Sequence, residues 1–342
     1  MPERLSYRDA GVDRDAADRA KQRISALVDS TASDAVLSRV GSFGGLFRAP
    51  AGMRDGVLVA SADGVGTKLK VAMLAGRHDT VGEDLVNHCV DDILVEGARP
   101  LFFLDYLGMG HLEEGTVEAV VAGVARGCQA NGCSLLGGET AEMPDFYAPG
   151  EYDLAGFIVG VVENDDRPGR HRVRAGDALV GVASGGFHTN GYTLLRRLLF
   201  DRLGLGPDDP FPDLEVSVVD VLLRVHRSYL GSVGPRIADG RVQALAHITG
   251  GGIPGNLARV LPDGVEARVR RGSWQVPPEF RVVMEQGVDE QEMVRTFNMG
   301  VGMVLITRPE DADAVVAELE ADGETAWLLG SVENGDGGVV LV

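Results

Sequence analysis

Short apolar runs alternate with stretches of helical hydrophobic spacing along the chain, which predicts strands and helices in both halves. Helical spacing also predicts a short amphipathic helix over residues 17–28. In the first half, the expected strands are 57–61, 101–107 and 154–162, and the expected helices are 82–96 and 115–130. This half therefore mixes the two kinds of element.

A charged segment rich in Pro and Gly, residues 163–177, separates this half from the next and predicts a domain boundary. Beyond it, the expected elements are strands at 178–183, 301–307 and 326–332 and helices near 192–200, 217–233 and from Pro309 to Gly323. We expect an α/β (α+β) protein of two domains, residues 1–165 and 166–342.

Composition limits the classes of partner. With 342 residues the chain has room for roughly two domains. A formal charge of −19 repels polyanions, so nucleic acid is not an expected partner. A phosphorylated ligand would need metal ions and local cations to enter this field. No apolar run approaches the roughly 18 residues of a membrane span, so we expect a cytoplasmic protein without a membrane partner.

Cysteine and histidine usage argues against a disulfide framework or a structural zinc. The three cysteines, Cys89, Cys128 and Cys133, form no CxxC pair, and the sequence shows no clustered His. Buried reduced thiols are the expected state.

The stretch DGVGTK, from Asp63 to Lys68, follows an apolar strand but does not match a P-loop, because Thr precedes Lys and the first Gly is missing. Its glycines let backbone N–H groups approach an oxyanion closely, and Lys68 lies one turn away. A tight turn with an N-capping Asp63 is the structural alternative.

The predicted helix at residues 84–94 has an apolar half and a polar half. Its polar arc holds Asp84, Asn87, His88, Asp91 and Asp92. Asp91 falls in the middle of this arc, where we expect solvent. Asp92 falls at its apolar border, where a carboxylate is partly desolvated and wants a cation or a donor. Asp92 is therefore the candidate ligand, and ordinary surface charge is the alternative.

Three acids lie in the glycine-punctuated stretch LLGGETAEMPDFY, residues 135–147, which we interpret as a loop. They are Glu139, Glu142 and Asp145. Such acids repel one another unless a cation lies among them, and hard oxygen ligands suit Mg²⁺. Only the fold could bring Asp63 and Asp92 together with Glu139.

Two further glycine-rich loops precede predicted helices. SGGFHTNGY at 184–192 carries His188, Thr189 and Asn190, and HITGGGIPGN at 247–256 begins with His247. Donors at a helix N-terminus can form an anion site, so the two loops favour an anionic substrate. Each could also be a mere loop with a helix cap.

Taken together, these motifs resemble the phosphoribosylformylglycinamidine cyclo-ligase (AIR synthetase) family, almost from end to end. The motifs are SYRDAGVD at 6–13, DGVGTKLK at 63–70, PLFFLDYLG at 100–108, GCSLLGGETAEMP at 132–144, HTNGY at 188–192, HITGGG at 247–252 and RTFNMGVGM at 295–303. The glycine loops are shared by a wider superfamily, whereas SYRDAGVD, GGETAEMP and RTFNMGVGM in this order are typical of the cyclo-ligase.

The resemblance implies a ligase that uses ATP and Mg²⁺ to close the ring of formylglycinamidine ribonucleotide, giving aminoimidazole ribonucleotide, ADP and phosphate. It also implies a homodimer whose N-terminal mixed sheets join into a barrel, with a C-terminal α/β domain completing the cleft. Within the superfamily, a selenophosphate synthetase or a thiamine-monophosphate kinase is the alternative. The former usually bears a reactive Cys or selenocysteine in its N-terminal glycine loop, and GSFGGLF at 41–47 has none.

The resemblance also assigns roles to individual residues. The implied catalytic set is Asp63, Lys68, Asp92, His188 and His247, with Lys68 offsetting phosphate charge. The implied metal ligands are Asp63, Asp92 and Glu139. The implied ATP contacts are Gly44, Gly45, Gly64, Gly66, Thr67 and Lys68, under a mobile GSFGGLF flap. The implied substrate contacts are Gly138, Glu139, Thr189, Asn190, Gly250 and Gly251.

Overall fold

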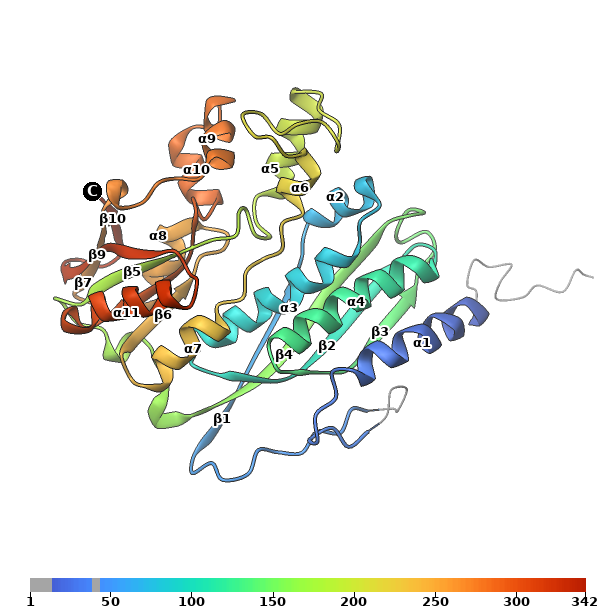
Figure 1. Cartoon of the computed structure of the whole chain (residues 1–342), viewed down its shortest axis with the longest axis horizontal. Helices are drawn as coiled ribbons and strands as arrows, with labels where there is room; N and C mark the ends of the chain where they lie inside the picture. Colours follow the sequence, from blue (N-terminus) through green and yellow to red (C-terminus); the bar gives the residue numbers. More distant parts are fainter. Residues whose placement is uncertain (1–13, 39–43) are drawn as a thin grey trace, which may run out of the picture.

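Two β-sheets, one built from each half of the chain, organise the fold in the computed structural model (Figure 1). The structure describes residues 14–38 and 44–342. The motif at 6–13 and the first part of the GSFGGLF loop, residues 41–43, lie outside the described residues.

The first sheet has four strands in the order β1-β4-β2-β3. They are β1 (Gly56–Gly64), β2 (Arg99–Met109), β3 (Ser134–Glu142) and β4 (Tyr152–Glu163). The pair β2–β3 is parallel, and β4 is antiparallel to both of its neighbours. One face is covered by α3 (Asp79–Leu94) and α4 (Glu114–Ala130), with α1 (Arg14–Asp29) packed on α4 (Figure 1).

The second sheet has six strands in the order β10-β7-β9-β5-β8-β6. They are β5 (Ala178–Ala183), β6 (Val242–His247), β7 (Val265–Val269), β8 (Val301–Thr307), β9 (Ala326–Asn334) and β10 (Val339–Leu341). The helices of this half of the chain are α5 (Tyr192–Arg196), α6 (Val218–Leu222), α7 (Leu230–Ala238), α8 (Gly252–Leu257), α9 (Pro278–Glu285), α10 (Glu290–Thr296) and α11 (Pro309–Ala321). Separate apolar clusters on its two faces include α8 on one side and α7 with α11 on the other.

The predicted strands and most helices are confirmed, with two corrections. The stretch at 135–147 is not wholly a loop, because most of it forms strand β3. The predicted helix 217–233 is broken into α6 and α7, and the segment between them, which includes His226, is not helical. No helix among the described residues is long and apolar enough to cross a membrane.

The environment predicted for the polar face of α3 is wrong. Asp84 and Asp91 are completely buried, and Asn87 and His88 are nearly so. The periodicity identified the two faces correctly, but the polar face packs against loops of the second half of the chain instead of solvent. All three cysteines are free and buried, as predicted.

The other face of the first sheet carries apolar side chains, and among the described residues Phe47 covers part of it by packing on Phe102 of β2. On it lie Leu58 and Phe157, 66% and 45% exposed, together with Ala62 and Val159. Such a contiguous apolar surface usually marks an interaction site.

Helices α3 and α4 approach closely because each has a glycine at the crossing. A Cβ atom on Gly82 would lie 2.2 Å from the Val120 carbonyl oxygen, and one on Gly123 would lie 2.0 Å from that of Asp79. Neither backbone oxygen can yield as a side chain could, so any larger residue must push the helices apart.

We therefore predict that Gly82→Ala and Gly123→Ala each destabilise the protein by about 1–3 kcal/mol, through overpacking. Gly115→Ala, in the same helix as Gly123 but with open space around its Cβ, should be neutral or stabilising because alanine favours helix. Urea unfolding of the three variants measures this, and a loss of stability at Gly115 equal to that at Gly82 would contradict it.

Candidate active site

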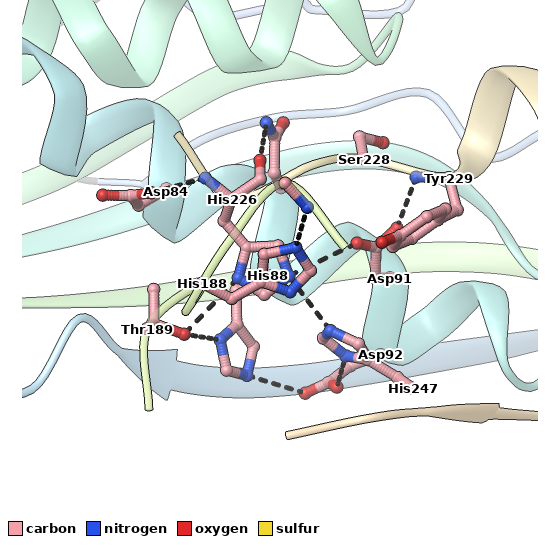
Figure 2. A network of polar contacts seen from close by, with 12 residues as sticks. Asp84, His88, Asp91, Asp92, His188, Thr189, His226, Ser228, Tyr229 and His247 are labelled. Carbon is pink, nitrogen blue, oxygen red and sulfur yellow. Dashed lines mark hydrogen bonds and ion pairs between the residues drawn. The ribbon is translucent and has the colours of Figure 1, made fainter. Parts of the chain in front are cut away.

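Four of the seven histidines meet where α3 faces the second half of the chain (Figure 2). His88 comes from α3, His188 from the loop before α5, His226 from the segment between α6 and α7, and His247 from the end of β6. All four side chains are almost completely buried. The fold thus creates a histidine cluster that the sequence spacing does not show.

Three of these rings and a hydroxyl connect two carboxylates in a line, which we call the relay. Its members, in order, are Asp63, His88, Thr189, His226, His247 and Asp92. The contacts are Asp63 Oδ2–His88 Nε2 2.9 Å, His88 Nδ1–Thr189 Oγ1 2.8 Å, Thr189 Oγ1–His226 Nδ1 3.4 Å, His226 Nε2–His247 Nε2 3.0 Å and His247 Nδ1–Asp92 Oδ1 2.9 Å. Ser61 Oγ donates to the other Asp92 oxygen (3.1 Å).

The five contacts determine how many protons the relay holds. Each contact needs one hydrogen between its two atoms, and the Thr189 hydroxyl supplies one of the five. The three imidazole rings must then carry four hydrogens, whereas three neutral rings carry only three. With both carboxylates ionised, one ring is therefore an imidazolium and the relay carries a net charge of about −1.

The pKa shifts place the extra proton on His88. Burial lowers the pKa of His88, but the hydrogen bond and charge of Asp63 outweigh burial and raise it. Burial lowers the pKa of His226 well below its ordinary value, and it also lowers that of His247. Burial would raise the pKa values of Asp63 and Asp92, but contacts with His88 and His247 lower both.

His188 stands beside the relay. Its ring stacks on His226, with centroids 3.9 Å apart. Its Nε2 accepts a hydrogen bond from the Gly185 N–H (3.0 Å), which puts its proton on Nδ1. Nδ1 is buried and has no hydrogen-bond partner among the described residues, so this donor is unsatisfied.

Of the three predicted metal ligands, the structure brings two together. Asp63 and Asp92 both contact His88, and their side chains are 42% and 28% exposed. Glu139 is separated from Asp63 by β4 and β2, roughly 14 Å at normal strand spacing. Strand pairing across the sheet aligns Glu139 with Gly64, the neighbour of Asp63 in β1. Because successive residues of a strand point to opposite faces, Glu139 and Asp63 lie on opposite faces of the sheet. The expected three-acid set is not assembled within the described chain.

Lys68, which the resemblance implies offsets phosphate charge, lies in the interior of the protein. Lys68 is completely buried, and its ammonium donates to Asp84 Oδ1 (2.8 Å) and to the carbonyl oxygens of His188 (3.2 Å) and Arg224 (2.7 Å). These bonds occupy its three hydrogens, so no donor is left for a phosphate. Lys68 holds the two halves of the chain together instead.

Side chains of α3 fix the segment that carries His226. Asp84 Oδ1 accepts the His226 N–H (2.7 Å), and Asn87 donates to the His226 carbonyl oxygen (2.7 Å). Asp91 accepts the Tyr229 N–H (2.8 Å). Because α3 binds these backbone groups, the segment does not continue the helix. The sequence analysis did not propose His226 as a site residue, and it named His88 only as part of the polar arc. The i, i+4 spacing of His88 and Asp92 was the signal that could have identified His88.

The two predicted substrate loops lie beside each other. The position of a Cβ on Gly250 is 3.1 Å from Asn190 Oδ1. Asn190 Nδ2 is buried without a partner, and Gly251 caps α8 with a φ of 98°. Gly138 packs against Asp105, where a Cβ would lie 2.0 Å from a carboxylate oxygen. Substrate binding by these residues stays a prediction.

Some of the residues predicted to contact ATP are exposed to solvent. Thr67 is exposed and its hydroxyl meets that of Thr193 (2.8 Å). Gly66 has a φ of 62°, which favours glycine. Gly64 ends β1, while Gly44 and Gly45 are exposed and Gly45 lies beside Leu136 of β3. Nothing in this arrangement tests nucleotide binding.

Comparison with known proteins gives matches over most of the chain. Residues 46–162 match the N-terminal domain model of AIR synthase related protein, and residues 174–342 match the C-terminal domain model. The phosphoribosylformylglycinamidine cyclo-ligase of Trichlorobacter lovleyi is 50% identical over 97% of this chain and 95% of its own length. That of Sorangium cellulosum is 51% identical over 96% and 95%.

Solved structures share the fold at lower identity. Thiamine-monophosphate kinase from Stenotrophomonas maltophilia superposes with a TM-score of 0.70 at 18% identity, covering 95% of this chain and 94% of its own. Hydrogenase maturation protein HypE, in a complex with ATP, superposes with a TM-score of 0.71 at 22% identity, covering 97% and 93%. At these identities the likeness establishes the two-domain fold alone.

The buried neutral imidazole of His188 predicts a loss of stability in acid. Burial, followed by the charges of His247 and Lys68, lowers its pKa well below 6.5 in the folded state. Below pH 6.5 His188 therefore binds a proton in the unfolded chain but not in the folded chain, and the free energy of unfolding falls as the pH is lowered. His226 acts in the same direction and His88 in the opposite one.

We expect His188→Asn to flatten this dependence by up to about 1.4 kcal/mol per pH unit. Asparagine is chosen because residue 188 has a φ of 58°, which it tolerates well. Urea unfolding between about pH 7.5 and 5.5 compares the slopes; parallel curves for parent and variant would show that His188 is not the group responsible.

Proposed function

The chain belongs to the phosphoribosylformylglycinamidine cyclo-ligase family, and from this premise we propose how its site carries out the reaction. The assignment rests on one observation: about half of the residues of this chain are identical to those of relatives with that name, over nearly the whole chain. The alternatives, thiamine-monophosphate kinase and selenophosphate synthetase, are not favoured, because the kinase shares only the fold.

The reaction is the ATP-dependent ring closure of formylglycinamidine ribonucleotide in purine biosynthesis. We propose that the formyl oxygen attacks the γ-phosphorus of ATP and releases ADP. The resulting imidate-like phosphate is a good leaving group. The amidine-side nitrogen then attacks the formyl carbon, gives up one proton, and expels phosphate. Such phosphoryl transfer depends mainly on positioning and charge neutralisation.

The carboxylates of Asp63 and Asp92 fit a Mg²⁺ ion that binds together with ATP. Mg²⁺ is usually held by one or two carboxylates plus substrate phosphates, and these two side chains are partly exposed and both lie near His88 Nε2. When bound, the ion would neutralise charge on the transferred phosphoryl group. Asp63 and Asp92 would hold it, and Lys68 would take no direct part.

Two unpartnered donors support a substrate position at the 188–190 loop. His188 Nδ1 and Asn190 Nδ2 are buried and have no hydrogen-bond acceptor in the part of the chain that the structure describes. Leaving such groups unsatisfied costs about 1–3 kcal/mol each. Oxygens of the substrate would satisfy both, which makes this loop the better supported of the two substrate loops.

We expect turnover to require ATP, Mg²⁺ and formylglycinamidine ribonucleotide together, and to yield aminoimidazole ribonucleotide, ADP and phosphate in equal amounts. ADP release and ring formation, followed in parallel, test this. Equal ADP release with thiamine monophosphate or selenide in place of the amidine would refute the assignment.

Substitutions at the two adjacent acids of α3 separate a metal ligand from a buried neutral group. Asp92→Asn removes a charge that would attract the metal and should lower the rate on the order of 10² to 10³-fold. Asp91 differs because burial raises its pKa well above the ordinary value. Asn mimics that protonated acid and can still accept the Tyr229 N–H, so Asp91→Asn should cost less than about fivefold. Steady-state rates with ATP and the amidine measure both, provided that the melting curves match the parent. A larger loss at Asp91 would reverse the assignment.

The open face of the first sheet supports the proposed homodimer. Leu58 and Phe157 are large apolar side chains that remain exposed in the single chain. A second copy packed on this face would bury both and could close the two sheets into a barrel. Glu139 lies on the same face as Phe157, so a partner subunit would lie next to it.

We predict that Phe157→Asp converts a dimer into a monomer, because a charge would be buried in an apolar interface. Leu328→Asp, an equally drastic change at an exposed position of β9 in the second sheet, should leave the mass unchanged. Light scattering after size exclusion gives the masses. A parent protein of 36.2 kDa in solution would contradict the dimer.

A further inference from the structure

We propose that His88 and His247 join Asp92 and Asp63 as direct ligands of a divalent cation, and that this site binds a borderline transition-metal ion such as Zn²⁺ or Co²⁺ more tightly than Mg²⁺. The inference deepens the metal site of the proposed function and rests on it for the two carboxylates. The imidazole ligands and the resulting metal preference are additional to it.

The geometry suits three donors around one ion, and Asp63 contacts one of the three. His88, Asp92 and His247 each present one ligand atom, and these atoms lie within 4.8 Å of one another. His88 Nε2 is 3.9 Å from Asp92 Oδ2 and 2.9 Å from Asp63 Oδ2, and His247 Nδ1 is 2.9 Å from Asp92 Oδ1. An ion with bonds of about 2.0–2.1 Å keeps neighbouring tetrahedral ligands about 3.3 Å apart. These three distances lie within about 0.6 Å of that separation.

Rigid elements hold these donors in place. His88 and Asp92 are one helical turn apart on α3, Asp63 is the last residue but one of β1, and His247 ends β6. The i, i+4 spacing puts two donors on one face of a helix. The Ser61 hydroxyl, 3.1 Å from Asp92 Oδ2, fixes the carboxylate as well.

Each imidazole also has the outer contact that ligating histidines normally have. A metal-bound His donates its other ring N–H to an acceptor, which fixes its tautomer and orientation. His88 Nδ1 lies 2.8 Å from Thr189 Oγ1, and His247 Nε2 lies 3.0 Å from His226 Nε2. With metal on His88 Nε2 and His247 Nδ1, both outer nitrogens are donors, and Thr189 and a neutral His226 are their acceptors. The inner part of the relay thus serves as support for the ligands.

Donor chemistry then decides which ion is preferred. Imidazole suits Zn²⁺, Co²⁺ and their neighbours, whereas Mg²⁺ prefers oxygen and retains several waters. A site of two carboxylates alone would suit Mg²⁺ with ATP. His88 contacts both carboxylates and His247 contacts Asp92, which makes a mixed nitrogen and oxygen set, and such a set favours transition metals over Mg²⁺.

The test measures metal binding to the intact, metal-free protein without nucleotide or substrate, so that it is independent of turnover. Co²⁺ titration should give the visible absorption of a nitrogen-containing site of low coordination number. Calorimetry should show Zn²⁺ and Co²⁺ binding more tightly than Mg²⁺. His88→Ala should weaken Co²⁺ binding by more than about 100-fold, and Thr189→Val, which removes only an outer contact, by about 10–100-fold. Mg²⁺ binding should not change in His88→Ala.

His111→Ala is the matched control, because His111 is exposed and lies outside the relay; it should bind Co²⁺ like the parent. Circular dichroism checks that each variant is folded. If His88→Ala does not fold, Co²⁺ binding by Thr189→Val and His247→Ala tests the proposal. Equal Co²⁺ affinity in the parent and in the folded variants of His88 and His247, or Mg²⁺ binding as tightly as Zn²⁺, would overturn the proposal. Loss of ring closure alone would leave it standing, since the metal is measured without substrate.

Discussion

The arrangement of the site depends on one buried ion pair, Lys68 with Asp84, and on the backbone groups that it binds. Burying two charges is expensive, and removing one partner of such a pair costs about 3–5 kcal/mol because the other is left uncompensated. Here the cost is offset by additional bonds: Lys68 also holds the carbonyl oxygens of His188 and Arg224, and Asp84 also holds the His226 N–H. The pair thereby fixes the two loops of the second domain that carry histidines against α3 of the first.

That constraint explains which sequence predictions succeeded. The phase of α3 was correct, and Asp92 does lie at the border between its two faces, in contact with His247. The error concerned what covers the polar face. Hydrophobic periodicity reports that a face is polar, but it does not distinguish water from the polar backbone of another domain. Asp91 accepts the Tyr229 N–H at zero exposure, and nothing in its neighbourhood in the sequence marks that partner.

Two other failures have a common cause, since both depend on contacts between distant segments. The helical pattern at 217–233 was real, but the helix is interrupted because Asn87 and Asp84 bind the backbone of His226. Glycines at 137–138 suggested a loop, yet they lie in strand β3, where Gly138 leaves room for the side chain of Asp105. Local propensity yields to such tertiary contacts. The strands of the second sheet, which are continuous apolar runs such as β8, carried their own signal and were predicted at the correct positions.

The acid at the mouth of the DGVGTK stretch follows from the same arrangement. Lys68, the cation that a phosphate-binding loop would offer, is buried and already hydrogen-bonded to other groups of the chain. The relay carries a net charge of about −1 by its proton count. In a chain with a formal charge of −19, a nucleotide polyphosphate approaching Asp63 and Asp92 meets repulsion until a cation is bound there. If Asp63 and Asp92 hold Mg²⁺ as we propose, the ion would serve nucleotide entry as well as chemistry. The positive charge that a P-loop provides as a lysine would then arrive with the ligand, which agrees with carboxylates rather than amines at the end of the strand and the border of the helix.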